Sequence, residues 1–421
     1  MLQSAIELEF ATIPVYLCGL WTIQSDPDSV VTQILTNIVV TEMRHLAIAA
    51  NVMIATGGTP DITAAVPAYP AFLPDGETVF KVDLLPFGQA FLEQATWIES
   101  PTPVTSVSPV NFGRESPFAP RFVRAQPTLA MGEMFGTIGE FYTALIQTLN
   151  NLVTDLGEPA VFPNSANVAA QYNGIDFLGF PDFSGSSTLV VANSTEAVTL
   201  LQDIKDEGEG TSPGIMWDET GTLLSHYYSF QEILLGRQYV AGDTPGSPSG
   251  SAIAVPTGSQ VLAMVENPTM DMYPAESDVW NAANSFNTAF GELVTSLQQA
   301  FSGTNTNPGA TIESAIELMN SLQTEGLAVL AFPLPGNAAV AVAGPTFNNG
   351  FVPLTPCQQA TIAVEQASTF VRDAQIAVDI ARMGDNTAEG KLEYEVALRQ
   401  LADAQKTLAS AELAQQKACA E

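Results

Sequence analysis

The stretch Glu42-Met-Arg-His45-Leu-Ala-Ile-Ala-Ala-Asn51 decides the fold that we expect from this sequence. A glutamate and a histidine three residues apart lie on one face of a helix, so both side chains can reach the same ion. The stripe to which they belong predicts a helix that faces a bundle; its members are Leu35, Ile38, Glu42, His45, Ala49 and Val52. Helical bundles that bind metal in their core combine single glutamates from two helices with Glu-x-x-His from the other two.

A second stripe opens the chain, and Glu9 is its only charged member; the other members are Leu2, Ile6, Ile13, Tyr16 and Leu20. Burial of an unpaired carboxylate is costly, so such a side chain is normally paired, protonated or bound to a metal. Two interpretations of Glu9 therefore stay open. It is a metal ligand, or it is a buried carboxylate that tyrosine, threonine or Arg44 satisfies.

Two further bundle helices are expected over residues 128–152 and 221–237. The first carries Glu140 beside its apolar stripe, and the second carries His226, one of only two histidines in 421 residues. The residue three positions before His226 is Leu223, where a second Glu-x-x-His would have glutamate. Substitutes at other spacings are Glu209, Glu219 and Glu232.

The charge of the chain is strongly negative, with 45 acidic against 13 basic residues and a formal net charge of −32. This balance argues against nucleic acid and against an anionic membrane as partners, because both require a basic face. The apolar run over residues 11–23 is too short to cross a bilayer, and no signal peptide is visible. Only 14% of the residues are charged, so neutral polar side chains must cover much of the surface. We therefore expect an extracellular or secreted protein.

Three parts of the chain are expected: a four-helix bundle over 1–240, an accessory helical region packed on it over 241–354, and an alanine-rich helical hairpin over 355–421. Shorter helices are expected over 87–98 and 196–207, and longer ones over 278–302 and 311–330. Cys357 and Cys419 lie at the open end of the hairpin, where a disulfide between them would suit an oxidising compartment. The hairpin either mediates homo-oligomer formation or packs on its own bundle.

Several motifs, in order along the chain, resemble the ferritin-like domain of iminophenyl-pyruvate dimer synthases of the violacein type. They are Leu2-Gln-Ser-Ala-Ile-Glu-Leu-Glu-Phe-Ala-Thr-Ile-Pro-Val-Tyr-Leu17, Glu42 to Asn51, Gly57-Gly-Thr-Pro60, Ile138-Gly-Glu-Phe-Tyr142, Gly208-Glu-Gly210, His226-Tyr-Tyr-Ser-Phe230, Val265-Glu-Asn-Pro268, Phe286-Asn287 and Ala343-Gly-Pro-Thr-Phe347. The resemblance covers about residues 1–351 and excludes the hairpin. It implies an all-α fold, a ferritin-like four-helix bundle with long irregular crossovers. The metal ligands that it implies, for iron or another divalent metal, are Glu9, Glu42, His45, Glu140 and His226.

Enzymes of that family couple two imine molecules derived from an aromatic amino acid in an oxidative step. The resemblance thus implies a non-haem metal oxidoreductase that acts on a small aromatic substrate. Leu223 departs from the expected ligand pattern, because it cannot bind a metal. Two hypotheses follow: an oxidoreductase with an altered metal site, or a non-catalytic structural or self-assembling protein that kept the bundle and binds no metal.

Overall fold

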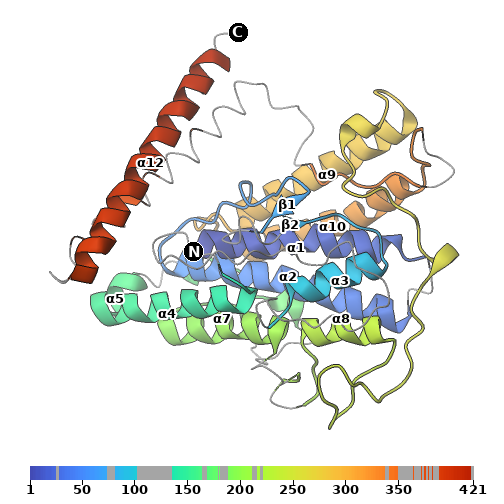
Figure 1. Ribbon diagram of the computed structural model, residues 1–421, viewed down its shortest axis with the longest axis horizontal. Coiled ribbons are helices and arrows are strands. Elements are labelled where there is room, and N and C mark those ends of the chain that lie inside the picture. Colours follow the sequence, from blue (N-terminus) through green and yellow to red (C-terminus); the bar gives the residue numbers. More distant parts are fainter. Residues whose placement is uncertain are drawn as a thin grey trace. The chain divides into compact units, whose positions relative to one another are not determined.

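A computed structural model of the chain (Figure 1) describes residues 1–24, 28–73, 81–101, 135–163, 168–178, 180, 188–210, 216–218, 221–336, 341–348, single positions between 364 and 382, and 388–418. The chain forms two compact units. The first comprises residues 1–123 and 135–351, and the second comprises residues 124–134 and 352–421.

Two long helices form the centre of the first unit: α1 (Leu2–Thr22) and α2 (Val30–Ala55). They pack against each other along their length (Figure 1). Ser29 caps α2 by accepting a hydrogen bond from the backbone N–H of Thr32, which satisfies a donor that the first helical turn leaves free. By length and composition alone α2 could cross a membrane, but 83% of its most apolar window is buried inside the fold. That burial is typical of a core helix.

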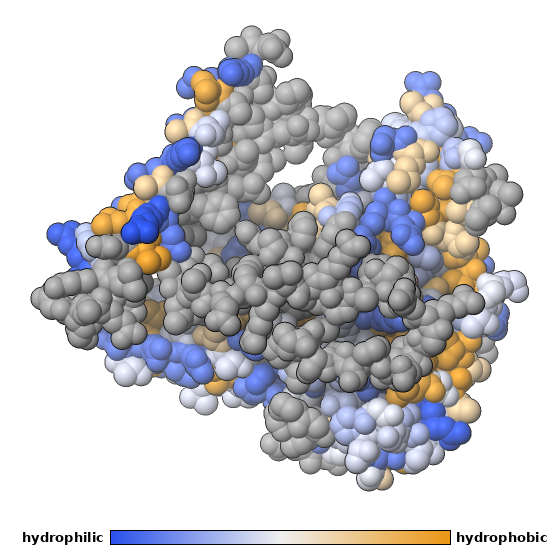
Figure 2. Space-filling model, viewed as in Figure 1, coloured by the Kyte–Doolittle hydropathy of each residue, from blue (hydrophilic) through white to orange (hydrophobic). Residues whose placement is uncertain are grey.

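A second group of helices covers the faces of α1 and α2. It consists of α3 (Gln89–Ile98), α4 (Ile138–Leu156), the short α5 (Glu158–Val161), α7 (Ser194–Glu209) and α8 (His226–Leu235). Helix α4 packs on α7 and α3 packs on α8, while α2 contacts both α7 and α8. Where described residues are visible, hydrophilic side chains dominate the outer side of α4 and α7, at the lower left of Figure 2. These helices are therefore amphipathic and bury only their inner faces.

The accessory helices α9 (Asp278–Ala300) and α10 (Pro308–Leu330) pack on each other, and α10 contacts α1. Aromatic side chains of α9 join the same core: Phe286 packs edge-on against Trp21, and Phe290 lies 6.2 Å from Phe10 between ring centres. The remaining elements are small: an antiparallel pair of two-residue strands, β1 (Ala71–Phe72) and β2 (Lys81–Val82), and three 3₁₀ turns, η1 (Ile175–Phe177), η2 (Gly258–Gln260) and η3 (Met270–Met272). The all-α fold predicted from the sequence is confirmed.

In the second unit, the structure describes the long helix α12 (Ala388–Ala418). Val378 from the preceding segment and Ala397 from α12 are buried together, with Tyr394 and Leu401 packed beside them. Ala397, Tyr394 and Leu401 of α12 therefore pack around Val378. Cys357 and Cys419 both lie outside the described residues, so the disulfide stays a prediction.

Two helices begin later than the sequence pattern predicts. Helix α4 begins at Ile138, where Thr137 acts as N-cap, and α8 begins at His226 after Ser225. As a result, Glu140 lies in the first turn of its helix, and Leu223 lies before the start of its helix. Both shifts change which side chains can reach the core.

Candidate metal centre

Five side chains that can bind metal converge in the core of the first unit. Glu9 comes from α1, Glu42 and His45 come from α2, Glu99 follows the last residue of α3, and His226 is the first residue of α8. None of the five is more than 6% exposed. Their ligand atoms form two groups, and within each group the atoms lie within 4.8 Å of one another. We call these groups the His45 triad (Glu9, Glu42, His45) and the His226 triad (Glu42, Glu99, His226).

In the His45 triad, one ring nitrogen faces two carboxylates. Nδ1 of His45 lies 3.4 Å from Oε2 of Glu9 and 3.9 Å from Oε1 of Glu42. Both carboxylates have a hydroxyl donor. The Tyr142 hydroxyl donates to Oε1 of Glu9, and the Thr12 hydroxyl donates to Oε2 of Glu42 at 2.9 Å. The hydroxyls thereby fix the carboxylates while other oxygens stay turned toward the histidine.

The His226 triad has the same plan on the other side of Glu42. Nδ1 of His226 lies 2.9 Å from Oε1 of Glu42 and 3.9 Å from Oε2 of Glu99, while the Tyr16 hydroxyl donates to Oε1 of Glu99. Although the first distance is short, the geometry is not that of a hydrogen bond, and Nδ1 is a buried nitrogen without a hydrogen-bond partner among the described residues. A buried, unpartnered imidazole nitrogen beside two carboxylates is a position that a cation fits. The two histidine rings lie 5.6 Å apart between their centres.

The pKa values in the cluster show how unfavourable these buried charges are without a cation. Burial is the main reason that the pKa of Glu9 rises to about 7 and that of Glu99 to about 8. Burial would also raise the pKa of Glu42, but contacts with His226 and His45 outweigh it and lower that pKa. Burial would lower the pKa of His45, but hydrogen bonds to Glu207 and Glu9 raise it well above its usual range. Near neutral pH the cluster thus retains protons, which a metal ion would displace.

A second layer of charged groups comes from α7 and surrounds His45. Oε2 of Glu207 is 2.7 Å from Nε2 of His45, and Oε1 of Glu207 is 2.8 Å from Nη1 of Arg44. Nη2 of Arg44 donates to Oδ2 of Asp203 at 2.6 Å. Sequence reasoning missed both acidic residues, because the helix over 196–207 was predicted without a role. The available signal was Arg44 itself, since a guanidinium next to a buried His45 needs acidic partners.

Glu140 does not join the cluster, which corrects its prediction as a ligand. It is exposed, and its Oε2 accepts from the backbone N–H of Gly136 at 2.7 Å, while its own N–H donates to the Thr137 hydroxyl. These contacts cap the first turn of α4, which begins later than predicted. The third element that brings a carboxylate to the cluster is the end of α3. Glu99 was missed because a single acid just after a short helix belongs to no apolar stripe.

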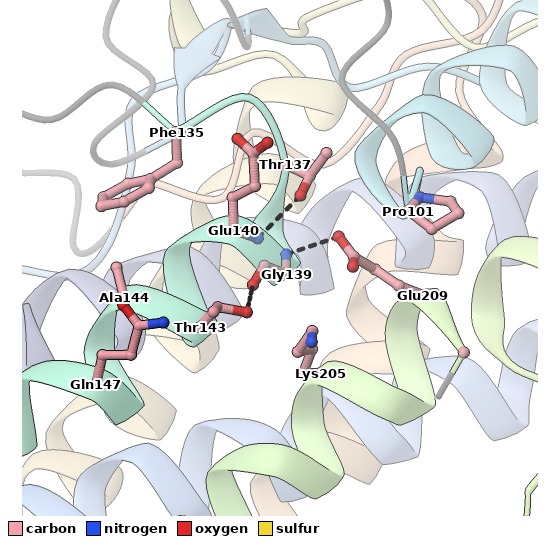
Figure 3. Close-up of a pocket in the computed structure, with 11 residues that line it drawn as sticks. Pro101, Phe135, Thr137, Gly139, Glu140, Thr143, Ala144, Gln147, Lys205 and Glu209 are labelled. Carbon is pink, nitrogen blue, oxygen red and sulfur yellow. Dashed lines mark hydrogen bonds between the residues drawn. The ribbon is translucent and has the colours of Figure 1, made fainter. Parts of the chain in front are cut away.

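Glu140 instead lines a surface pocket of about 400 Å³ at the start of α4 and the end of α7 (Figure 3). In Figure 3 the carboxylate of Glu209 points to the backbone N–H of Gly139, from which it accepts a hydrogen bond of 2.7 Å. A Cβ atom at Gly139 would lie 1.8 Å from that carboxylate, so this contact requires glycine. Glu209 is therefore held at the pocket and is not the substitute ligand that its sequence position allowed.

Glu232, another proposed substitute for Leu223, is also held away from the cluster. Glu232 accepts a hydrogen bond from the backbone N–H of Tyr239, and Glu219 lies outside the described residues. The backbone N–H of Leu223 donates to Asp218 at 2.8 Å in the segment before α8. Position 223 is thus not on the helical face of His226. Among the residues that the structure describes, the cluster has three carboxylates, and Glu42 serves both histidines.

A buried group of carboxylates and histidines inside an all-α bundle is typical of helical bundles that bind metal in their core. Comparison with known proteins agrees with this class. The ferritin-like family matches residues 2–235, more than half of the chain. The chain belongs to the ferritin-like family. A ferritin-like protein from Caulobacter vibrioides has a similar solved structure, with a TM-score of 0.51 and 23% identity over 82% of this chain and 96% of that one. That likeness concerns the fold. No curated protein sequence matches the chain.

Proposed function

We propose that the cluster binds two divalent metal ions, one in each triad, with Glu42 between them. The observation that carries this proposal is the presence of two triads that share Glu42 at the centre of a ferritin-like bundle. Charge supports it. The three cluster carboxylates, together with the single net negative charge of Asp203, Glu207 and Arg44, would be neutralised by two divalent cations.

Iron is the metal that we propose, with manganese as the closest alternative. Each triad offers carboxylate oxygens and one imidazole nitrogen, a donor set that suits both metals and that two-metal helical bundles use. When bound, iron would supply redox chemistry toward oxygen or an oxidised substrate. Tyr142, Thr12 and Tyr16 would each hold one ligand carboxylate in place through its second oxygen. The resemblance to imine dimer synthases makes an oxidoreductase the reaction class that we propose.

A small aromatic molecule is the proposed substrate, and the pocket beside Glu140 is a suitable position for it. The pocket volume of about 400 Å³ lies in the range of ligand sites. Phe135 and Pro101 give it apolar walls, and Lys205 gives it a positive charge (Figure 3). Its rim is next to the cluster: Gly208 precedes the lining residue Glu209, and a Cβ at Gly208 would lie 3.1 Å from Oε2 of Glu99.

A structural scaffold without metal is the second candidate, and one observation favours it. Every cluster carboxylate already accepts a hydrogen bond from a protein hydroxyl, through Tyr142, Thr12 or Tyr16. Within the described part of the chain, the cluster also has one carboxylate fewer than the usual two-metal bundle. In this case the residues 355–421 would carry the function, as a self-assembly element.

The metal content of protein purified without chelators separates the two candidates. We expect about one to two equivalents of iron or manganese per chain by elemental mass spectrometry. The variant Glu42→Ala removes the shared ligand and should lose the metal. Its matched control is Glu140→Ala, which removes an exposed glutamate of the same fold and should keep the metal. Less than about a tenth of an equivalent after reconstitution with Fe(II) would contradict metal binding and favour the scaffold.

A further inference from the structure

The carboxylate sides of the two triads follow the same plan, whereas their histidines differ in support. Both use Glu42, and each has one further carboxylate that a buried tyrosine holds: Glu9 with Tyr142 and Glu99 with Tyr16. All of these groups are almost completely buried. Because the carboxylate sides match, any difference in metal affinity between the triads must come chiefly from the histidines.

His45 is held by a chain of charged groups. Its Nε2 lies 2.7 Å from Glu207, and Arg44 contacts Glu207 at 2.8 Å and Asp203 at 2.6 Å. A neutral imidazole that donates its Nε2–H to a carboxylate has its lone pair on Nδ1. Nδ1 is the nitrogen that faces Glu9 and Glu42. The Glu207 contact therefore selects the tautomer and the ring orientation that metal binding requires.

His226 has no equivalent support. Its Nδ1 makes no hydrogen bond, and neither ring nitrogen has an acidic partner besides Glu42 and Glu99 within the described part of the chain. Nothing there holds the ring from behind, so binding of a metal must itself fix the tautomer and the rotamer. A carboxylate behind a ligating histidine typically contributes about 10- to 100-fold to metal affinity.

We propose that Glu207, fixed by Arg44, is a positioning residue that makes the His45 triad the tighter of two unequal metal positions and the first to fill. This inference rests on the proposed two-metal function. It adds an order of loading, and it assigns to α7 a role in metal binding although α7 supplies no ligand.

Titration of metal-free protein with Mn(II), followed by calorimetry, tests the proposal. We expect two binding steps whose dissociation constants differ by about tenfold or more. In Glu207→Gln the side chain keeps its shape and loses its charge. The tighter step should then weaken by about 10- to 100-fold, while the weaker step keeps its affinity.

Asp203→Asn is the matched control, because it removes the other acidic partner of Arg44 without touching His45. If the ion pairs only support the fold, both variants should change Mn(II) binding equally. If Glu207 positions His45, Asp203→Asn should change the tighter step by less than about threefold. In Zn(II)-loaded protein, the NMR signal of the His45 Nε2–H should persist in Asp203→Asn and be lost or strongly shifted in Glu207→Gln.

Two equal binding steps in the unmodified protein, or equal effects of the two variants, would overturn the proposal. A single tight step that Glu207→Gln leaves unchanged would overturn it as well. Absence of any Mn(II) binding in the unmodified protein is a different result. It would reject the proposed metal function itself, and the order of loading with it.

Discussion

Glutamates lie both in the buried cluster and at the pocket at the start of α4, but their surroundings differ. Glu9 and Glu99 lie in the core, held by tyrosines and turned toward histidines, whereas Glu140 lies at the surface and caps a helix. In sequence, Glu9 and Glu140 look alike, since each stands in or beside an apolar helical stripe. The difference teaches that the residue at which a helix begins decides whether an acid within it faces the core or the solvent.

The largest expected effect is that of Glu42→Ala, which removes the ligand common to both triads. We expect loss of nearly all bound metal, since each remaining group has only one carboxylate and one histidine. Elemental analysis of the purified variant measures this loss, and circular dichroism checks that the helices remain. Retention of metal at the level of the unmodified protein would show that the ions bind elsewhere.

Arg44→Ala should have the next largest effect, on stability. The substitution removes a buried guanidinium from contact with Asp203 and Glu207, and breaking a buried ion pair in this way costs about 3–5 kcal/mol. Urea unfolding of the metal-free protein measures the change. Arg237→Ala is a suitable control, because Arg237 is exposed and donates to the backbone carbonyl of Gly250. A similar loss in both variants would argue against a special cost of the buried charges.

The pH dependence of stability should separate the cluster from the pocket. The pKa of Glu9 is raised to about 7 and that of Glu99 to about 8, so the folded protein holds these protons more tightly than the unfolded chain. Their stabilisation is therefore complete below about pH 4.5 and is lost as the pH rises toward 8. The metal-free protein should lose about 3 kcal/mol or more between pH 5 and pH 8.

Metal should remove most of this dependence, because bound ions replace the protons. The loaded protein should keep a weaker decline between pH 5 and 7, from Glu209 at the pocket and from Glu232, because burial raises the pKa of each to about 7. Thermal unfolding across this pH range, with and without Mn(II), provides the measurement. Parallel curves for the two forms would mean that metal does not bind at Glu9 and Glu99.

The smallest effect is expected for Glu140→Gln at the pocket. A glutamine can still accept the hydrogen bond from Gly136, so stability should change by no more than about 0.5 kcal/mol. Metal content should stay that of the unmodified protein. A loss of metal as large as that of Glu42→Ala would restore Glu140 as a ligand and contradict the distinction between the two regions.

Much of the fold could be predicted from the sequence because its signals are local. The stripes of α1 and α2 repeat at helical spacing, and the first three members of the cluster follow directly from them: Glu9, Glu42 and His45. His226 could be identified because histidine is so rare in this chain. These predictions depend only on periodicity and composition, which do not require knowledge of distant contacts.

The rest of the cluster depends on contacts between segments far apart in the sequence. Glu99 reaches Tyr16 across 83 positions, and Glu207 reaches His45 across 162. Neither acid is marked by an apolar stripe, and only tertiary packing brings them to the core. The error at Glu140 had a different source. Its apolar stripe is real, but Thr137 starts the helix there, so the acid falls in the capping turn.

The most direct test is an anomalous difference map from crystals loaded with Mn(II). The account predicts two peaks in the bundle core, one contacted by Glu9, Glu42 and His45, and the other by Glu42, Glu99 and His226. At low Mn(II) concentration only the first peak should appear. A core without any peak, or metal bound at the pocket beside Glu140 instead, would contradict the claim that Glu42 joins two metal positions.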